Sequence, residues 1–236
     1  MLRSPAVKKI VLIWLVWWLC LFAFQEFVTR RFQPQRPDTA LEWNRTETGK
    51  TSQNNKPYLL DAFLNQHVSW DSEFYLAIAD MGYDNPDIRT VPGEDGKAVS
   101  LNYAFFPLYP FLMRVVAAPL AVFGLSRIAT LTLAGLVIAL LGTLGAMLAL
   151  YDLARGWLGE MGGLRAAYYL LVFPTGFFLA QVYTEGLFLG LAFGALALIQ
   201  RRRLGWAAPL VALAIWTRAV GVALIVPMTL AAVEQI

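Results

Sequence analysis

The feature that most restricts the fold of this chain is a succession of long apolar runs. They cover residues 10–28, 105–124, 128–153, 164–183, 186–199 and 206–233. A helix needs about 20 predominantly apolar residues to cross the hydrocarbon of a membrane, and 58% of the 236 residues are hydrophobic. The sequence therefore predicts an all-α, polytopic transmembrane helical bundle that forms a single module over 1–236.

The charged residues are segregated along the chain. Eleven of the 16 acidic residues fall within 38–95, whereas basic residues cluster at Lys8–Lys9 and Arg201–Arg203. Such asymmetry orients a membrane chain and does not indicate a nucleic-acid partner.

The 236 residues contain one cysteine and one histidine. The single cysteine, Cys20, excludes an intramolecular disulfide within them, and the single histidine, His67, excludes a His-rich metal site. Acids of the polar loop could bind a divalent cation, but no ligand spacing requires one, so no metal ligand is assigned.

The positive-inside rule predicts the side of the membrane on which each loop lies. Run 10–28 follows two lysines and is interpreted as a retained anchor with a cytoplasmic N-terminus, so the polar loop 29–104 is extracytoplasmic. The arginines at 201–203 are then cytoplasmic, which requires an odd number of crossings after the loop. We expect 105–124 not to cross, because three prolines and Arg114 suit a re-entrant or interfacial helix. The alternative is that all four runs between the polar loop and Arg201 cross the membrane and that the three arginines lie outside.

The polar loop contains an aromatic, acid-rich stretch, WDSEFYLAIADMGY, at 70–83. Ser69 or Asp71 can cap a helix that ends at Gly82, and its amphipathic spacing suits a position on the membrane surface. Asp71 is then either a simple N-cap or an exposed acid of an active site. The other acids are expected to be solvated: Glu73, Asp80 and Asp84.

Further ionisable residues lie close to apolar runs. Glu185 follows the helix-breaking stretch FPTGFF at 173–178, and it is either a carboxylate at the membrane rim or part of a site. Arg218 lies partway along run 206–233, which is expected to lead outward, and a buried arginine needs an anion such as Glu185 or a phosphate. Arg114 is a second arginine that could hold an anion.

An outward-facing acid, a second acid and arginines beside lipid suit a reaction on a lipid-phosphate substrate. The acid would accept a proton from an attacking hydroxyl, and an arginine would neutralise the departing phosphate. Intramembrane acids also suit a proton-coupled transporter or a flippase of lipid-linked glycans. A transport path would have acids towards both faces of the membrane, whereas the acids here gather on one side, which favours an enzyme.

Four motifs in order carry a resemblance to a known family. They are WDSEFYLAIADMGY at 70–83, AFFPLYPFL at 104–112, FPTGFFLAQVYTEGLFL at 173–189 and WTRAVG at 216–221. The sequence resembles the phosphatidylinositol-glycan (GPI) mannosyltransferase II family and its prokaryotic relatives, which are integral-membrane glycosyltransferases of the GT-C class. The resemblance implies a GT-C fold with a long first extracytoplasmic loop carrying interfacial helices. Family members are longer, so we expect this chain to correspond to the N-terminal part of such an enzyme.

The resemblance also implies a reaction. An inverting transferase would move a mannosyl or related residue from a polyprenyl- or dolichyl-phosphate sugar to a glycan or glycolipid acceptor. It would act among membrane lipids on the extracytoplasmic face of a prokaryotic plasma membrane or of the endoplasmic reticulum. The pattern assigns no cofactor. A catalytically inactive partner subunit with the same fold is the remaining alternative.

The same resemblance assigns roles to residues. Asp71 would be the general base, Glu185 would be a second or acceptor-binding acid, and Arg218 would hold the donor phosphate. Trp70 and Tyr75 would stack on the sugar or line a groove for the lipid.

Overall fold

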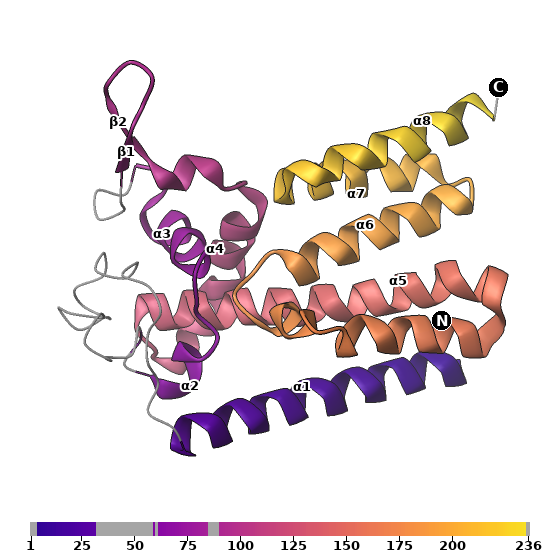
Figure 1. Cartoon of the computed structure of the whole chain (residues 1–236), viewed down its shortest axis with the longest axis horizontal. Coiled ribbons are helices and arrows are strands. Elements are labelled where there is room, and N and C mark those ends of the chain that lie inside the picture. The colour runs from indigo at the N-terminus through magenta and orange to yellow at the C-terminus, as the bar shows by residue number, and fades with distance from the viewer. Residues whose placement is uncertain (1–3, 32–58, 60, 85–89, 235–236) are drawn as a thin grey trace. The chain divides into compact units, whose positions relative to one another are not determined.

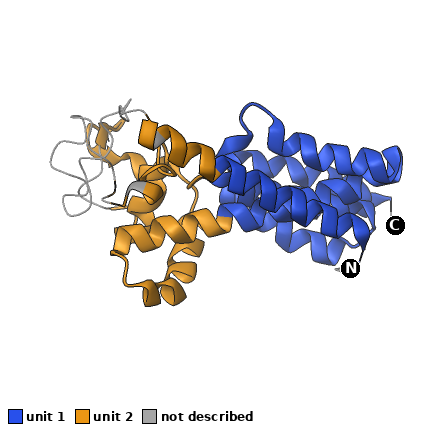
Figure 2. Cartoon of the chain, turned by 90° about the horizontal axis from the view of Figure 1, so that it is seen from below, with its two compact units in different colours: residues 1–21, 139–180, 184–236 blue, residues 22–138, 181–183 orange. Residues whose placement is uncertain are grey.

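Helices dominate the computed structural model, which describes residues 4–31, 59, 61–84 and 90–234 (Figure 1). The chain divides into two compact units, coloured separately in Figure 2. Unit 1 consists of residues 1–21, 139–180 and 184–236, and unit 2 consists of residues 22–138 and 181–183. The predicted all-α class is confirmed in the described parts of the chain, with one small two-stranded sheet as the exception.

Two long helices supply residues to both units. Helix α1 covers Pro5–Arg31 and α5 covers Arg127–Val172. The stretch Pro5–Val28 and helix α5 are long and apolar enough to cross a membrane, by length and composition alone. The other apolar helical stretches of the described chain, counted with the 3₁₀ turns that adjoin them, have 10–17 residues, which is shorter than the roughly 20 residues of a perpendicular span.

Helix α5 turns back on itself at Gly159, so it is a hairpin of two helical arms (Figure 1). Gly159 has φ 70° and ψ 178°, a backbone conformation that glycine adopts readily and other residues do not. The arms touch near the turn, since a Cβ added at Gly163 would lie 2.8 Å from Cδ2 of Tyr151. The first arm contains the predicted run 128–153.

The second arm of α5 is shorter than the predicted run 164–183, because it ends at Val172. Pro174 disfavours helical backbone at Phe173, the residue before it. A 3₁₀ turn, η3 (Gly176–Ala180), follows. The helix break that the sequence predicted in this stretch is therefore confirmed, and it removes the last part of the expected span.

The predicted run 186–199 is helix α6 (Glu185–Gln200). The last predicted run, 206–233, is not the single outward span that the sequence suggested. It consists of α7 (Leu204–Thr217), the 3₁₀ turn η4 (Ala219–Leu224) and α8 (Ile225–Val233). Arg218 therefore lies at the turn between two short helices and not partway along a span.

Helix α8 folds back beside α7 (Figure 1). Arg202, which precedes α7, donates Nη1 to Ala231 O at 3.2 Å and pairs with Glu234 at 2.6 Å. The turn itself is tight, because a Cβ on Gly221 would lie 2.6 Å from the carbonyl carbon of Ala214. Composition concealed this turn, since the run stays apolar on both sides of it.

The two ends of the helices in unit 1 carry different charges. At one end the α5 hairpin meets the α6–α7 turn through Asp152, which pairs with Arg155 at 2.9 Å and also with Arg201, the first of three consecutive arginines. Glu185 begins α6 and Arg218 follows α7 at the opposite end. Unit 1 thus has a basic end and an end where an acid meets an arginine.

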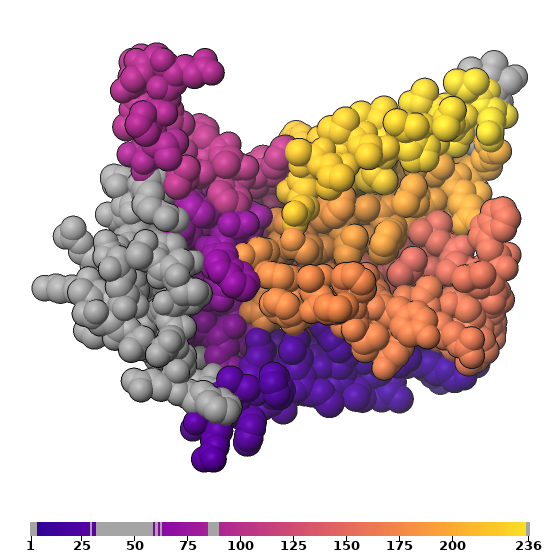
Figure 3. All heavy atoms as spheres, in the orientation of Figure 1, coloured from indigo at the N-terminus to yellow at the C-terminus, as the bar shows by residue number. Residues whose placement is uncertain are grey.

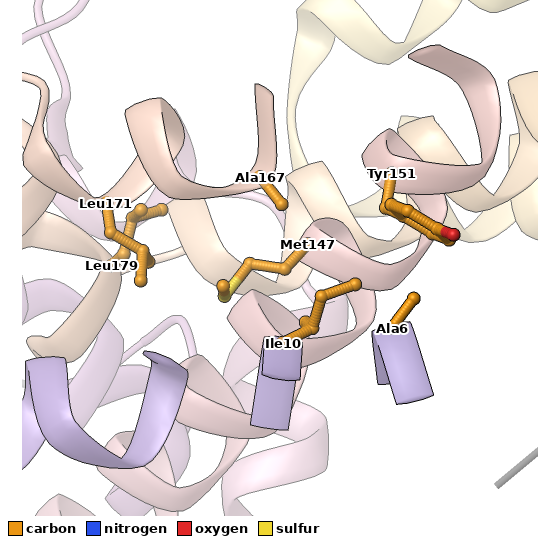
Figure 4. Packing of buried hydrophobic residues seen from close by; sticks show 7 residues of the cluster. All are labelled: Ala6, Ile10, Met147, Tyr151, Ala167, Leu171 and Leu179. Atoms are coloured by element: carbon orange, nitrogen blue, oxygen red, sulfur yellow. The ribbon is translucent and has the colours of Figure 1, made fainter. Parts of the chain in front are cut away.

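The core of unit 1 joins α1 to both arms of α5 and to η3 (Figure 4). Its members are Ala6, Ile10, Met147, Tyr151, Ala167, Leu171 and Leu179. Helices α5 and α6 pack closely through glycine, since a Cβ on Gly142 would lie 2.6 Å from the carbonyl carbon of Gly186. Small residues of this kind allow close approach of helices that lack a hydrophobic driving force in lipid.

Helix α8 lies on the surface of unit 1 (yellow in Figure 3), and its large apolar side chains are exposed there. The exposed residues are Ile225, Val226, Leu230 and Val233. A contiguous exposed apolar face is typical of a surface that contacts lipid or another protein.

Unit 2 contains several short helices and the two-stranded sheet. They are α2 (Ala62–Asn65), α3 (Ser72–Met81), η1 (Leu101–Ala104), α4 (Leu108–Leu120), η2 (Ala121–Phe123) and strands β1 (Thr90–Pro92) and β2 (Ala98–Ser100). The strands pair antiparallel with Val91 opposite Val99, and this hairpin projects from the rest of its unit (Figures 1 and 3). Helix α4 falls within the predicted interfacial or re-entrant stretch 105–124, and its 13 residues rise by only about 20 Å.

Candidate active site

Asp71 lies at the N-terminal end of α3, but its side chain does not cap that helix. Eight of the ten residues of α3 are buried, so the helix is packed inside unit 2 and does not rest on a membrane surface as the sequence suggested. Asp71 itself is exposed, has φ −68° and ψ −13°, and makes no side-chain capping hydrogen bond. Asp71 thus occupies the N-cap position of α3 without supplying a side-chain cap. The predicted end of the helix at Gly82 is confirmed, with φ 95° at this residue.

The VYTE segment holds the N-terminal end of α3 in place. The backbone N–H of Asp71 donates to the hydroxyl oxygen of Tyr183 at 3.1 Å, and Ser72 Oγ donates to Val182 O at 3.0 Å. In return, the N–H of Val182 donates to His67 O at 3.0 Å. Two motifs that are far apart in sequence are thus joined within unit 2, and their hydrogen bonds fix the backbone that carries the Asp71 carboxylate.

Trp70, the residue before Asp71, has an unusual backbone conformation. Its φ is 46°, a left-handed value that is rare for a bulky residue. Strained residues of this kind cost about 1–3 kcal/mol each and cluster at functional sites. The side chain is 48% exposed, so a large aromatic surface remains open beside the exposed acid.

Of the three other acids that were expected to be solvated, Asp84 is exposed as predicted, whereas Glu73 and Asp80 are largely enclosed. Glu73 is only 1% exposed, because it lies in the buried first turn of α3. Asp80 forms an ion pair with Arg127, the first residue of α5. Asp84 accepts a hydrogen bond from the hydroxyl of Tyr103 at 2.7 Å, and this bond raises the pKa of the Tyr103 hydroxyl.

Tyr75 is placed differently from the expectation that it stacks on a sugar or lines a lipid groove. It is 7% exposed, and its ring packs edge-to-face against Phe105 at 5.2 Å, Tyr109 at 5.3 Å and Tyr183 at 6.3 Å between centroids. Such contacts stabilise a core by about 0.5–1.5 kcal/mol each beyond burial. Tyr75 therefore supports Tyr183 from inside unit 2 and presents no open ring face.

Arg218 and Glu185 meet in unit 1. Arg218 Nη1 forms an ion pair with Glu185 Oε1 and donates to Thr184 Oγ1 at 3.0 Å. The sequence predicted an anion for Arg218, and Glu185 was one of the two possibilities. The side chain of Arg218 is 40% exposed, so it is less buried than its position in an apolar run suggested. The guanidinium can therefore keep its carboxylate partner and still reach an external anion.

Arg114 does not contact Asp71. Its Nε donates to Ala79 O, and its Nη2 donates to Ile78 O at 2.9 Å. These carbonyls belong to the C-terminal end of α3, where a cation interacts favourably with the helix dipole. Arg114 thus lies at the opposite end of α3 from the candidate base.

Sequence reasoning missed Tyr183 and the burial of Glu73. Tyr183 follows an apolar run and resembles an interfacial anchor, and its only distinguishing signal was its place in the motif that also contains Glu185. Glu73 lies between Ser72 and Phe74 in a charged stretch, and amphipathic spacing gave no indication that α3 is buried on nearly every side.

The profile of the family described as Mannosyltransferase (PIG-V) matches residues 7–234. The chain belongs to this family. The matched range contains every residue that the four motifs singled out, including Asp71, Glu185 and Arg218. No solved structure matches the chain.

Two curated relatives align with part of this chain. Mouse GPI alpha-1,6-mannosyltransferase 2 is 32% identical over 156 residues, and its rat counterpart is 31% identical over the same number. The alignments cover 64% of this chain and 28% of each relative. The chain therefore matches less than a third of the length of these relatives.

No group of three His, Cys, Asp or Glu side chains in the described part of the chain could hold a metal ion. The buried His67 packs against Phe22 at 4.5 Å and Phe63 at 4.9 Å between ring centroids. Unit 2 thus supplies Asp71 and Trp70 as candidate residues, and unit 1 separately supplies the ion pair of Glu185 with Arg218.

The contact between the two motifs makes a prediction. Tyr183→Phe removes the hydroxyl that accepts the backbone N–H of Asp71, so we expect a loss of about 1 kcal/mol in the free energy of unfolding and a lower melting temperature in detergent. Tyr168→Phe, at an exposed tyrosine of α5, is the matched control and should melt like the wild type. Equal melting temperatures for the Tyr183 variant and the wild type would contradict the structural role of this hydroxyl.

Proposed function

We propose that this chain carries the catalytic residues of an inverting mannosyltransferase that uses a polyprenyl- or dolichyl-phosphate sugar. Membership of the mannosyltransferase family supports the class of reaction. The observation that carries the proposal is the exposed position of Asp71, whose backbone is held by hydrogen bonds between two of the family-like motifs. Its substrates would be a lipid-phosphate mannose donor and a glycan or glycolipid acceptor.

The proposed reaction is a single displacement at the anomeric carbon. An acceptor hydroxyl gives its proton to the carboxylate while its oxygen forms the new bond to that carbon. The bond between the anomeric carbon and the phosphate oxygen breaks, and the lipid phosphate departs with the electron pair. Attack from the face opposite the phosphate inverts the configuration of the sugar.

Asp71 is the proposed base. The residue is exposed, and its backbone is fixed by Tyr183 and by the buried helix that follows. A rigid support of this kind favours catalysis, because it holds the proton acceptor in position before the substrate arrives. The exposed ring of Trp70, on a strained backbone next to the base, is proposed to stack on a sugar.

Arg218 is the proposed partner of the donor phosphate. An arginine can bind an anion through several N–H groups at once, and its Nη1 is the only guanidinium nitrogen that hydrogen-bonds the described residues Thr184 and Glu185. Glu185 orients this guanidinium through the ion pair and is also proposed to contact the acceptor. Arg114 and Tyr75 are not included, because one holds helix carbonyls and the other lies in the aromatic core.

We further propose that 1–236 functions as one multi-pass membrane module with its active site outside the cytoplasm. The basic end of unit 1 would face the cytoplasm under the positive-inside rule. Glu185 and Arg218 lie at the opposite end of α6 and α7. An extracytoplasmic site suits a lipid-linked donor, since nucleotide sugars are scarce there.

Asp71→Asn should abolish transfer, because an amide cannot accept the proton of the attacking hydroxyl. We expect a rate at least about 100-fold lower, measured as release of polyprenyl phosphate from polyprenyl-phosphate mannose in membranes that contain the full chain and its acceptor. Asp84→Asn is the matched control, as it changes another acid of the same loop and keeps an oxygen for Tyr103. Undiminished turnover in the Asp71 variant would remove this residue as the base.

Arg218→Gln should weaken donor use. Loss of one charged contact to phosphate is expected to raise the donor KM about tenfold, with a smaller change in the acceptor KM. Glu185→Gln separates this role from a structural one, because it also breaks the ion pair but leaves the guanidinium in place. If both variants raise the donor KM equally, the arginine acts on the fold and not on the phosphate.

Cysteine labelling tests the proposed sidedness. In a Cys20→Ser background, Lys97→Cys on the exposed hairpin should react with a membrane-impermeant maleimide from outside the cell. Gly205→Cys, where an added side chain meets no atom within 4 Å among the described residues, should react only after permeabilisation. Labelling of both positions from one side would overturn the assignment.

A further inference from the structure

Unit 2 contains a charged cavity at the other end of α3 from Asp71. The cavity has a volume of ≈ 560 Å³ and lies where α3, α4, the following turn and the start of α5 come together. Its charged lining residues are Asp80, Arg114 and Arg127. Asp80 lies nine residues after Asp71 along the helix, which corresponds to about 14 Å of rise. The proposed base and this cavity are therefore different places on the same unit.

The two arginines are only partly used by the protein. Arg114 donates Nε and Nη2 to carbonyls of α3, and Arg127 directs Nε and Nη2 to the carboxylate and the carbonyl of Asp80. In each case Nη1 donates to no group among the described residues. The three side chains together carry a formal charge of +1. The protein thus fixes two guanidinium groups at the rim of a cavity and leaves N–H donors for an external acceptor.

Apart from Thr130, the rest of the cavity lining is apolar. Its apolar lining consists of Ala117, Ala118, Ala121, Leu125 and Leu131. Small alanine side chains on α4 leave a trough beside the guanidinium groups. On other faces α4 and η2 expose large apolar residues, among them Phe111, Val115 and Phe123. A positive rim beside an apolar trough matches a ligand with an anionic group attached to hydrocarbon.

We propose that this cavity binds the phosphate group of an anionic membrane phospholipid, with its hydrocarbon chains along the alanine trough of α4. The two guanidinium groups supply the planar, multiple N–H donors that suit phosphate oxygens. A soluble anion would use the charges but not the apolar wall. The proposal does not rest on the sugar transfer proposed above, because lipid binding is measured here without any transfer reaction.

The probe is dioctanoyl phosphatidylglycerol, titrated into the full chain in a non-ionic detergent and followed by native mass spectrometry. Arg127→Gln and Arg114→Gln should each weaken binding about tenfold, because each removes a charged donor. Arg203→Gln removes the same charge at the basic end of unit 1 and should change the affinity less than twofold.

Asp80→Asn gives the opposite expectation and guards against misfolded arginine variants. The amide keeps an oxygen for Arg127 but removes the competing negative charge, so we expect about threefold to tenfold tighter binding. A role of the arginines confined to holding α3 predicts no gain of affinity. Unchanged or weaker binding in this variant would therefore overturn the proposal.

A parallel titration with inorganic phosphate identifies the source of the anion. We expect inorganic phosphate to bind at least about 100-fold more weakly than dioctanoyl phosphatidylglycerol and to displace it correspondingly poorly, because phosphate cannot fill the apolar trough. Equal competition by phosphate would assign the cavity to a soluble anion and overturn the lipid proposal.

Discussion

The candidate residues of each unit depend on hydrogen bonds made by part of one short segment, Val182 to Glu185. Within unit 2, Val182 and Tyr183 bind the residues that begin α3 and hold the backbone of Asp71. Within unit 1, Thr184 and Glu185 bind Arg218. Each unit thus uses part of one short segment to fix one charged group. Loss of these bonds would leave an acid on an untethered helix end and an arginine without its carboxylate partner.

Helix α3 shows how a short buried helix can carry different chemistry at its two ends. Its N-terminal end carries an exposed carboxylate, and its C-terminal carbonyls receive N–H groups of Arg114. This polarity agrees with the helix dipole, which favours negative charge near the N-terminus and positive charge near the C-terminus. Burial of the residues between them keeps the two charged ends a fixed distance apart.

Much of the helical plan follows from the sequence. Apolar runs marked α1, α5 and α6, Pro174 marked the end of the second arm of α5, and Gly82 marked the end of α3. These features are local, because a run length, a proline or a glycine acts on its own backbone. The need of Arg218 for an anionic partner was also predictable, since an arginine in an apolar run requires an anion.

Features that depend on tertiary contacts were not predictable. The α7–α8 turn forms where Gly221 packs against α7, and composition is the same on both sides of it. Glu73 and Tyr75 look accessible in a loop but are buried, and Tyr75 packs against Tyr109, which is remote in sequence. The burial of Arg218 was also overestimated from its position along the apolar run, because that position indicates depth in the membrane only if the helix continues past the residue.

The short length of α7 has a consequence for the surrounding lipid. Its 14 residues rise by about 21 Å, whereas the hydrocarbon of a typical bilayer is about 30 Å thick. A bilayer that contains α7 would have to thin locally or admit water towards the turn, since the Arg218 side chain remains 40% exposed beside Glu185 and Thr184. The membrane surface would therefore lie closer to Arg218. The phosphate of a lipid could then reach the arginine while most of the lipid's acyl or prenyl chain stays in the hydrocarbon.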